Sequence, residues 1–420
     1  MGHAAQGKSD RQLAPTQHKE DRQKEESEMS LKVLIAPLRY VQGPNALIQM
    51  GDQLQGIGIK NPLVMAGPRA MKACREAMSK SMEAKGIKFG FVEFKGESTF
   101  DEIKRVKNAC LSGKHDAIIA CGGGKALDTG RAAAAGGAVN AGIVPPQVIE
   151  NVGANVACIQ VPTIAATDAP TAKVSVIYNA KGGMETFLVF PTNPSMIFVD
   201  TKIIADAPAE TLVSGMGDAL ATYFEAAISD QTASPVLAGG LSTRTAQMMA
   251  RLAFDTLMEY GVQAKLEAEN HIAGQALEAV VEANILLSGL GYESGGLAAA
   301  HAIALSWTRV YHLFEVHPTH GQFVAFSLLT QLMMEATKPE LLNKVYAFCK
   351  SVGLPTTLEK LGLKKATDDA LRMVAEDASK IVLITSMPRA SKTPNSQGAF
   401  YDADEIFNCL KAADAYGRAF

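Results

Sequence analysis

The chain has 420 residues, 47% of them hydrophobic and 20% charged, which excludes a disordered or fibrous protein and predicts two globular domains. The net charge of −3 gives no basic surface for nucleic acid or for an anionic membrane, so we expect neither partner. No apolar run approaches the ~18 residues of a membrane span, and the first residues lack the apolar stretch of a signal peptide, so we expect a cytoplasmic protein.

The first half of the chain alternates short β-rich runs with helical stretches. Residues 1–30 are polar and mixed in charge, and we expect a disordered leader there. A strand over residues 61–67 precedes a helix that starts at Pro68 and ends at Gly86, and a strand over residues 87–94 follows. This alternation predicts an α/β fold with a doubly wound parallel sheet, and we assign residues 31–206 to this Rossmann-like domain.

A glycine run lies where the next buried strand ends. Residues 98–102 offer a capping box for the helix that follows them, and the strand over residues 115–121 leads directly into Gly122, Gly123, Gly124 and Lys125. Backbone N–H groups at a helix N-terminus attract phosphate, and glycines allow its close approach. The run matches neither the G-x-G-x-x-G pattern nor the P-loop, so a plain tight turn is the alternative.

Two further segments complete this half. Residues 136–156 are rich in glycine and proline, and we predict an unusually long loop. After the strand over residues 156–163, Asp168 lies between threonines and a proline. Its carboxylate either faces the ligand of the glycine run or closes an Asx-turn.

The second half of the chain is predicted to be helical. Strand signals nearly vanish after Asp206, and long stretches rich in alanine, leucine, methionine and glutamate follow. Asp206, Ala207 and Pro208 are typical of the start of a helix. We therefore assign residues 207–420 to an all-α domain.

Four of the eight histidines fall between residues 298 and 326. On one helix His301 and His312 would be about 16 Å apart, too far to share a metal ion. Pro318 interrupts the helical pattern, and Thr319 with Gln322 forms a capping box for a new helix with His320 in its first turn. The chain can thus reverse and bring His320 back toward His301.

Two imidazoles would leave a divalent ion in need of an oxygen ligand. The cysteines contain no C-x-x-C pair, which argues against a thiolate site. Asp218 is the best candidate, because it follows two glycines at what we predict to be the start of a helix, on a face that also carries Thr222 and Glu225. A solvated helix start is the alternative for Asp218, and a core histidine is the alternative for His301.

Six segments in this order resemble the glycerol dehydrogenase branch of the iron-containing alcohol dehydrogenase superfamily: GGGKALDTGR, VPTIAATDAPTAKVSVIYN, DTKIIADAP, GMGDALATYFEA, ESGGLAAAHAI and THGQFVAF. The resemblance runs from about Leu31 to the C-terminus. It implies a dinucleotide-binding domain, a helical metal-binding domain and a zinc ion in the cleft between them. It also implies a homo-oligomer.

The resemblance assigns roles to individual residues. The metal ligands fall on Asp218, His301 and His320, and the substrate contact falls on Asp168. The cofactor contacts fall on Gly122, Gly123, Gly124, Lys125, Thr163, Val174 and Tyr178. The implied reaction transfers hydride between a small polyol and NAD, while Zn²⁺, or Fe²⁺ in its place, lowers the pKa of the substrate hydroxyl so that an alkoxide forms.

Several positions depart from the pattern of the resembled family. Ala304, Leu305 and Thr385 replace polar residues, which predicts a more apolar pocket and a diol, hydroxyketone or aldehyde less polar than glycerol. Gly67 replaces an aspartate, with Arg69 nearby, so NADP is an alternative to NAD. A lyase similar to dehydroquinate synthase, which also uses NAD and zinc, and a non-catalytic relative are the alternative functions. The lyase would need clustered basic residues, and only Arg309 lies near the metal motifs.

Overall fold

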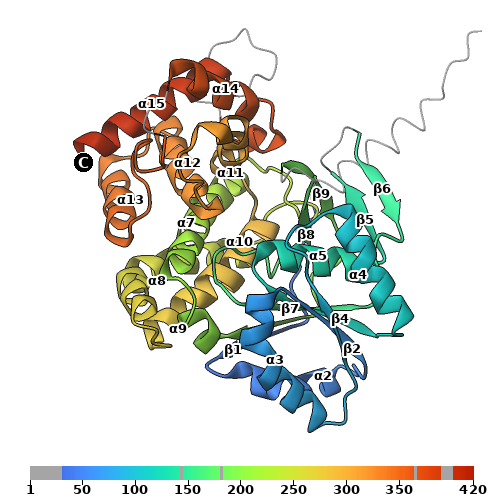
Figure 1. Cartoon of the computed structure of the whole chain (residues 1–420). Helices are drawn as coiled ribbons and strands as arrows, with labels where there is room; N and C mark the ends of the chain where they lie inside the picture. The colour runs from blue at the N-terminus through green and yellow to red at the C-terminus, as the bar shows by residue number, and fades with distance from the viewer. Residues whose placement is uncertain (1–30, 142–144, 180–182, 364–366, 389–400) are drawn as a thin grey trace, which may run out of the picture.

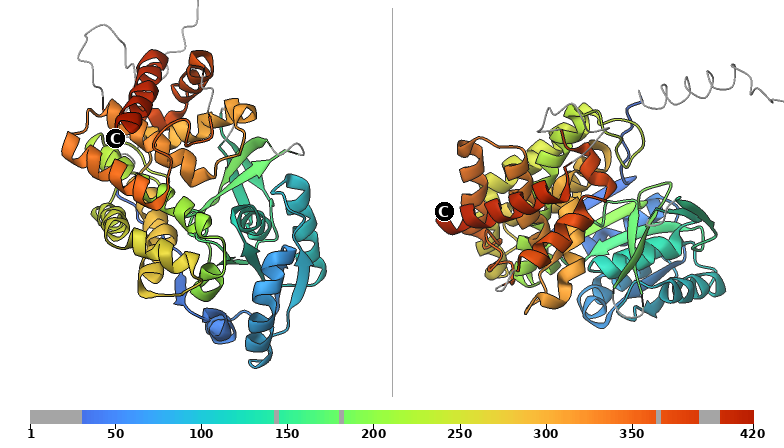
Figure 2. Two further views of the ribbon diagram at one scale, coloured as in Figure 1. Left: turned by 60° about the vertical axis from the view of Figure 1, so that its left-hand side comes forward. Right: turned by 90° about the horizontal axis from the view of Figure 1, so that it is seen from above.

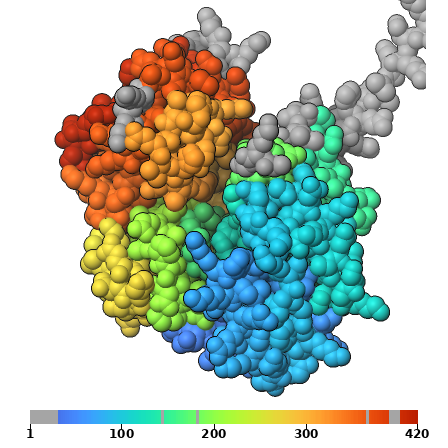
Figure 3. Space-filling model, viewed as in Figure 1, coloured from blue at the N-terminus to red at the C-terminus, as the bar shows by residue number. Residues whose placement is uncertain are grey.

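The computed structural model describes residues 31–141, 145–179, 183–363, 367–388 and 401–420. The predicted leader, residues 1–30, lies outside these ranges. Figures 1 and 2 show a part that carries the β-strands, coloured blue to green, beside a helical part coloured yellow to red. Figure 3 shows green residues from the middle of the chain where the two parts meet.

The first part contains a six-stranded sheet in which every neighbouring pair runs parallel. Its strands, in spatial order, are β1 (Arg39–Gly43), β10 (Met196–Asp200), β7 (Ala157–Pro162), β4 (Ala117–Gly122), β2 (Pro62–Ala66) and β3 (Gly90–Glu93). The predicted doubly wound parallel sheet is therefore confirmed.

Helices cover both faces of this sheet. On one face, α2 (Met50–Gly56) and α3 (Pro68–Glu83) pack on strand residues such as Val64 and Ile119. On the other face, α4 (Phe100–Ser112) and α5 (Gly124–Ala134) pack on Leu63 and Ile118, the strand residues that precede Val64 and Ile119. Successive side chains of a strand point to opposite faces, so strands buried on both faces are apolar throughout.

The predicted start of α3 is confirmed, and the capping box predicted for α4 is present only in part. Pro68 is the first residue of α3, and Gly86, just beyond its end, has a φ of +66° that favours glycine. Thr99 caps α4 by accepting a hydrogen bond from the amide of Glu102. The Glu102 carboxylate does not complete the capping box, because it accepts hydrogen bonds from the Lys95 amide and the Arg105 guanidinium.

The prediction of a long loop over residues 136–156 was wrong. This segment contains β5 (Gly137–Asn140) and β6 (Gln147–Glu150), which pair antiparallel in a second sheet of order β6-β5-β9-β8. The other two strands are β8 (Val174–Tyr178) and β9 (Met184–Val189). Two prolines just before β6 favoured a loop in the sequence, but β6 is an edge strand, and proline is tolerated at the start of such a strand.

The second part is helical, as predicted, and its helices enclose one large apolar core. After the short α6 (Thr201–Ala205), the long α7 (Ala209–Gln231) begins directly after Pro208, which confirms the predicted helix start. The remaining elements are α8 (Arg244–Glu269), α9 (Gln275–Glu282), the π-helical turn η2 (Ala283–Leu287), α10 (Ser288–Gly295), α11 (Ala299–Ser306), the 3-10 helix η3 (Trp307–Leu313), α12 (His320–Met334), α13 (Pro339–Val352), α14 (Asp368–Ala378), η4 (Val382–Ser386) and α15 (Ala403–Ala419). Among the described helices, none has both the length and the apolar character needed to cross a membrane.

Glycines bring α7 and α12 into backbone contact. A Cβ atom on Gly217 would lie 2.3 Å from the carbonyl oxygen of Gly321, and one on Gly321 would lie 1.7 Å from that of Ser214. Both positions therefore require glycine. The prediction that the glycines before Asp218 start a helix is wrong. Asp218 lies inside α7, where the glycine contact brings it near the first residue of α12.

Candidate metal centre and cofactor site

Three helices bring Asp218, His301 and His320 together. The Nε2 atom of His301 lies 3.3 Å from Oδ1 of Asp218, and Nε2 of His320 lies 3.4 Å from the same oxygen. One ligand atom from each residue lies within 4.8 Å of the other two. His320 occupies the first turn of α12 because the predicted capping box of Thr319 and Gln322 is present. The arrangement can surround a single divalent ion.

The chemistry of Asp218 fits a cation. The residue is 2% exposed, and neither carboxylate oxygen accepts a hydrogen bond from the described part of the chain. Burial raises the pKa of this carboxyl, but the imidazoles of His320 and His301 outweigh burial and hold its pKa below the ordinary value. A buried carboxylate without hydrogen bonds is costly unless a positive charge compensates it, and a metal ion would supply that charge.

Glu225, one turn further along α7 from Thr222, holds the other side of His301. Its Oε2 atom lies 2.5 Å from Nδ1 of His301, and its Oε1 atom accepts hydrogen bonds from the amides of Ala298 and His301 at 2.8 and 2.9 Å. A carboxylate on Nδ1 fixes the proton there and leaves the lone pair of Nε2 free for a metal. The sequence placed Glu225 on the face of Asp218, but it gave no sign that His301 would meet it.

Asp168 lies close to the metal ligands. Its Oδ2 atom accepts a hydrogen bond of 2.7 Å from the Ser288 hydroxyl, which contacts the Thr222 hydroxyl at 2.8 Å. Burial, followed by the nearby charge of Asp218, raises the pKa of Asp168 well above its ordinary value. Ser288 follows the π-helical turn η2, and its contact with Asp168 joins residues 120 positions apart, which no local sequence pattern marks.

The glycine run starts at the carboxyl end of β4, and Thr163 follows the carboxyl end of the neighbouring strand β7. The Thr163 amide donates to the Gly122 carbonyl at 3.0 Å, and a Cβ atom on Gly124, the first residue of α5, would meet no atom within 4 Å. The open space at the start of α5 is what a phosphate needs to reach helix amides.

Lys125, in the first turn of α5, reaches across to neighbouring strands and loops. Its Nζ atom lies 2.7 Å from Oε2 of Glu97 and 4.8 Å from the centre of the Tyr178 ring. Val174, at the start of β8, accepts a hydrogen bond from Arg131 through its main-chain carbonyl. These contacts place the predicted cofactor residues on adjoining elements.

The residues that depart from the resembled family lie in different surroundings. Leu305 is half-buried and follows His301 by one helical turn, so the two side chains share a face of α11. Ala304 is buried, whereas Thr385 is exposed and donates to the Val382 carbonyl at 2.7 Å. Arg309 is exposed and pairs with a carboxylate of α14 rather than with the metal ligands.

Comparison with known proteins gives consistent matches. The sequence profile of the iron-containing alcohol dehydrogenase family matches residues 37–201. A glycerol dehydrogenase of Escherichia coli O6:H1 is 37% identical over 93% of this chain and 98% of its own length, and one of Thermotoga maritima is 38% identical over 91% and 97%. The crystal structure of glycerol dehydrogenase from Schizosaccharomyces pombe superposes with a TM-score of 0.81, at 31% identity, over 93% of this chain and 92% of that one.

Proposed function

The chain belongs to the glycerol dehydrogenase branch of the iron-containing alcohol dehydrogenase family, and from this premise we propose which of its residues carry out the reaction. It is an NAD-dependent polyol dehydrogenase that uses a divalent metal. The lyase alternative is not favoured, since the relatives match as dehydrogenases over nearly their full length. The observation that carries the proposal is the buried Asp218 carboxylate, free of hydrogen bonds and faced by two imidazoles.

Asp218, His301 and His320 would hold the metal, for which we propose Zn²⁺. Two nitrogen ligands and one carboxylate suit zinc and leave a position open to substrate. The bound ion supplies a Lewis acid that lowers the pKa of a substrate hydroxyl. Glu225 keeps the proton of His301 on Nδ1 and holds the ring at the angle that the ligand set requires.

Asp168 would orient a second hydroxyl of the substrate. It lies near the metal ligands, and Ser288 fixes the direction of its carboxyl group. A substrate with two neighbouring hydroxyls can satisfy the metal and Asp168 together, whereas a simple alcohol cannot. This supports a preference for vicinal diols.

The amides at the start of α5 would hold the NAD pyrophosphate, with Lys125, Thr163, Val174 and Tyr178 around it. Bound NAD supplies the hydride acceptor. Gly123 and Gly124 keep side chains away from the phosphate, and the positive end of α5 attracts it.

We propose that the substrate is less polar than glycerol. Leu305 presents a half-buried apolar side chain on the face of α11 that carries His301. A methyl group would pack on this side chain, while a third hydroxyl would lose water there without gaining a partner. 1,2-Propanediol and 2,3-butanediol fit this description. The homo-oligomer and the domain boundary at residues 206 and 207 stay predictions.

The ligand assignment is tested with His320→Ala. This variant should lose bound metal and turnover of 1,2-propanediol, while it keeps its affinity for NAD, because His320 lies on α12 and makes none of the contacts described above for the glycine run. His312→Ala, on η3 of the same part, is the matched control and should retain both metal and activity. An active His320→Ala enzyme without metal would overturn the assignment.

A further inference from the structure

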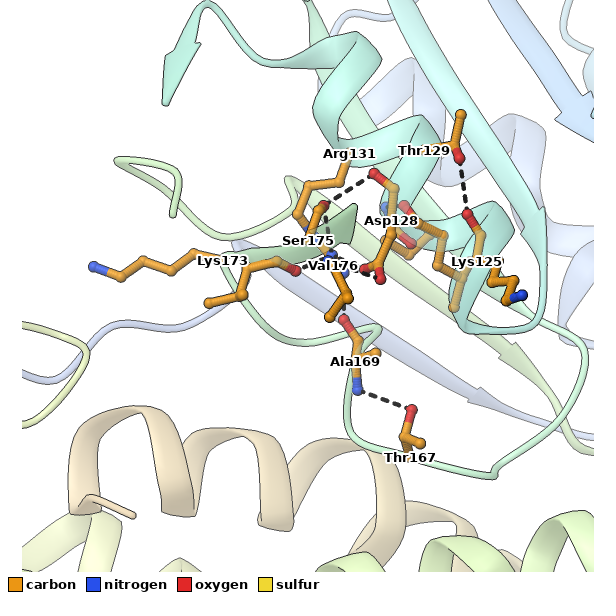
Figure 4. Close-up of polar contacts among 12 residues, drawn as sticks. Lys125, Asp128, Thr129, Arg131, Thr167, Ala169, Lys173, Ser175 and Val176 are labelled. Atoms are coloured by element: carbon orange, nitrogen blue, oxygen red, sulfur yellow. Dashed lines mark hydrogen bonds and ion pairs between the residues drawn. The ribbon is translucent and has the colours of Figure 1, made fainter. Parts of the chain in front are cut away.

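A buried ion pair inside α5 has no role in the chemistry proposed so far. Arg131 is 2% exposed, and its Nη1 atom lies 2.7 Å from Oδ1 of Asp128. Figure 4 shows this pair between α5 and the strand that carries Ser175 and Val176. Such a pair is weak evidence for stability, because desolvation of both charges offsets their attraction. The Nε atom of Arg131 has no acceptor in the described part of the chain, which adds to that cost.

The contacts of the pair converge on one segment, residues 169–176. Arg131 donates to the main-chain carbonyls of Ala169 and Val174 and, at 3.3 Å, to the Ser175 hydroxyl. Asp128 accepts a hydrogen bond of 3.1 Å from the Val176 amide through Oδ2, and its main-chain carbonyl accepts one of 2.9 Å from the Ser175 hydroxyl. The segment is thus tied to α5 near both of its ends, as the dashed lines in Figure 4 show.

This segment joins the two sites proposed above. Ala169 directly follows Asp168, and α5 starts at the glycine run. The helical part holds the same segment from the other side, where the Thr171 hydroxyl donates to the Ile285 carbonyl at 2.6 Å. The Ser288 hydroxyl contacts the Asp168 carboxylate itself. Among the contacts that tie the segment to α5, the one from Arg131 to the Ala169 carbonyl lies nearest to Asp168 in the chain.

We propose that Arg131 is a positioning residue, which holds the Asp168 carboxylate where it orients the diol and is itself held in place by Asp128. The inference rests on the proposed role of Asp168. Arginine suits this task because its planar group donates in two fixed directions, to Ala169 through Nη2 and to Asp128 and Val174 through Nη1. Lysine keeps the charge, but its single amino group cannot donate in these two fixed directions.

A double-mutant cycle tests the proposal. Arg131→Lys, Asp168→Asn and the double variant are assayed for kcat and KM with 1,2-propanediol, and NAD binding is measured by calorimetry without substrate. We expect Arg131→Lys to lower kcat/KM on the order of 10- to 100-fold, since a displacement of about 1 Å has effects of that size. In the Asp168→Asn background the same change should lower kcat/KM less than threefold. Because Arg131 also bonds the Val174 carbonyl, NAD affinity can fall, but by several-fold less than kcat/KM does in the wild-type background. Arg251→Lys, at an exposed ion pair with Asp255, is the control.

The results separate positioning from a structural role. An equal loss of kcat/KM in both backgrounds would overturn the proposal, and so would a loss confined to NAD affinity. If Arg131→Lys does not fold, Ser175→Ala removes only the hydroxyl between Arg131 and the Asp128 carbonyl and is placed in the same cycle, with the same non-additivity expected. A wild-type enzyme with bound metal and NAD that turns over no diol would refute the proposed function itself, and this inference with it.

Discussion

Replacement of Glu225 by glutamine tests how the protein prepares His301 for a metal. Glu225 is fully buried and accepts three hydrogen bonds, one of them from Nδ1 of His301. Glutamine has nearly the same shape, and its single oxygen can still accept from the amides of Ala298 and His301. Its NH2 group would then face Nδ1 and donate to it. The proton of the imidazole would move to Nε2, and the lone pair that faces Asp218 would be lost.

The expected decrease in metal affinity follows from the loss of this carboxylate. Mutation of outer residues that orient a ligating histidine lowers metal affinity by roughly 10- to 100-fold. At about 1.4 kcal/mol per factor of ten, this corresponds to about 1.4 to 3 kcal/mol of binding free energy. The metal-free fold should change little in stability, because the shape and two hydrogen bonds are retained.

The assay is competition for Zn²⁺ between the metal-free protein and a chelator of known affinity, with thermal unfolding measured in parallel. Glu102→Gln, at a buried carboxylate of the sheet part, is the matched control and should leave zinc affinity unchanged. Unchanged zinc affinity in Glu225→Gln would refute the role given to Glu225. A fall in affinity accompanied by an equal fall in the free energy of unfolding would attribute the effect to the fold instead.

Three further predictions concern pH, cofactor and substrate. Burial raises the pKa of Glu293 from 4.5 to about 7, so its contribution to stability is complete below pH 4.5 and is lost as pH rises through 7. The free energy of unfolding should therefore fall with rising pH by about 3 kcal/mol at most through this group. Glu293→Gln should reduce that fall, as measured by denaturant unfolding from pH 5 to 8. Gly67→Asp should raise the ratio of NAD to NADP turnover roughly tenfold, because a carboxylate there repels a 2′-phosphate. The position tolerates a side chain, since a Cβ atom would meet only Phe94, at 3.9 Å, and an unchanged ratio would remove this role. Leu305→Asn should shift kcat/KM toward glycerol over 1,2-propanediol, and an unchanged preference would mean that Leu305 does not contact the substrate.

The sequence predicted the features that depend on local patterns. Pro68 and Gly86 mark the ends of α3, and Thr319 with Gln322 caps α12 as predicted, because caps and turns use residues that are adjacent in the chain. The resemblance of six sequence segments also predicted the protein family, and the relatives confirm it.

The predictions failed where tertiary contacts override local signals. The glycines before Asp218 predicted the start of a helix, but Gly217 lies inside α7, where only glycine allows the backbone of α12 to approach. The contacts of Glu225, Ser288 and Arg131 join residues far apart in the chain. His301 lies 76 positions from Glu225, and Asp168 lies 120 positions from Ser288, so no local pattern marks these pairs.

We propose that this chain oxidises a polyol with NAD only when a divalent ion is bound. The most direct measurement is NADH formation from 1,2-propanediol and glycerol by protein treated with EDTA, before and after addition of Zn²⁺. We predict no turnover in the treated protein, recovery with the metal, and a higher kcat/KM for 1,2-propanediol than for glycerol. Full turnover by protein shown to contain no metal would contradict this requirement for a divalent ion.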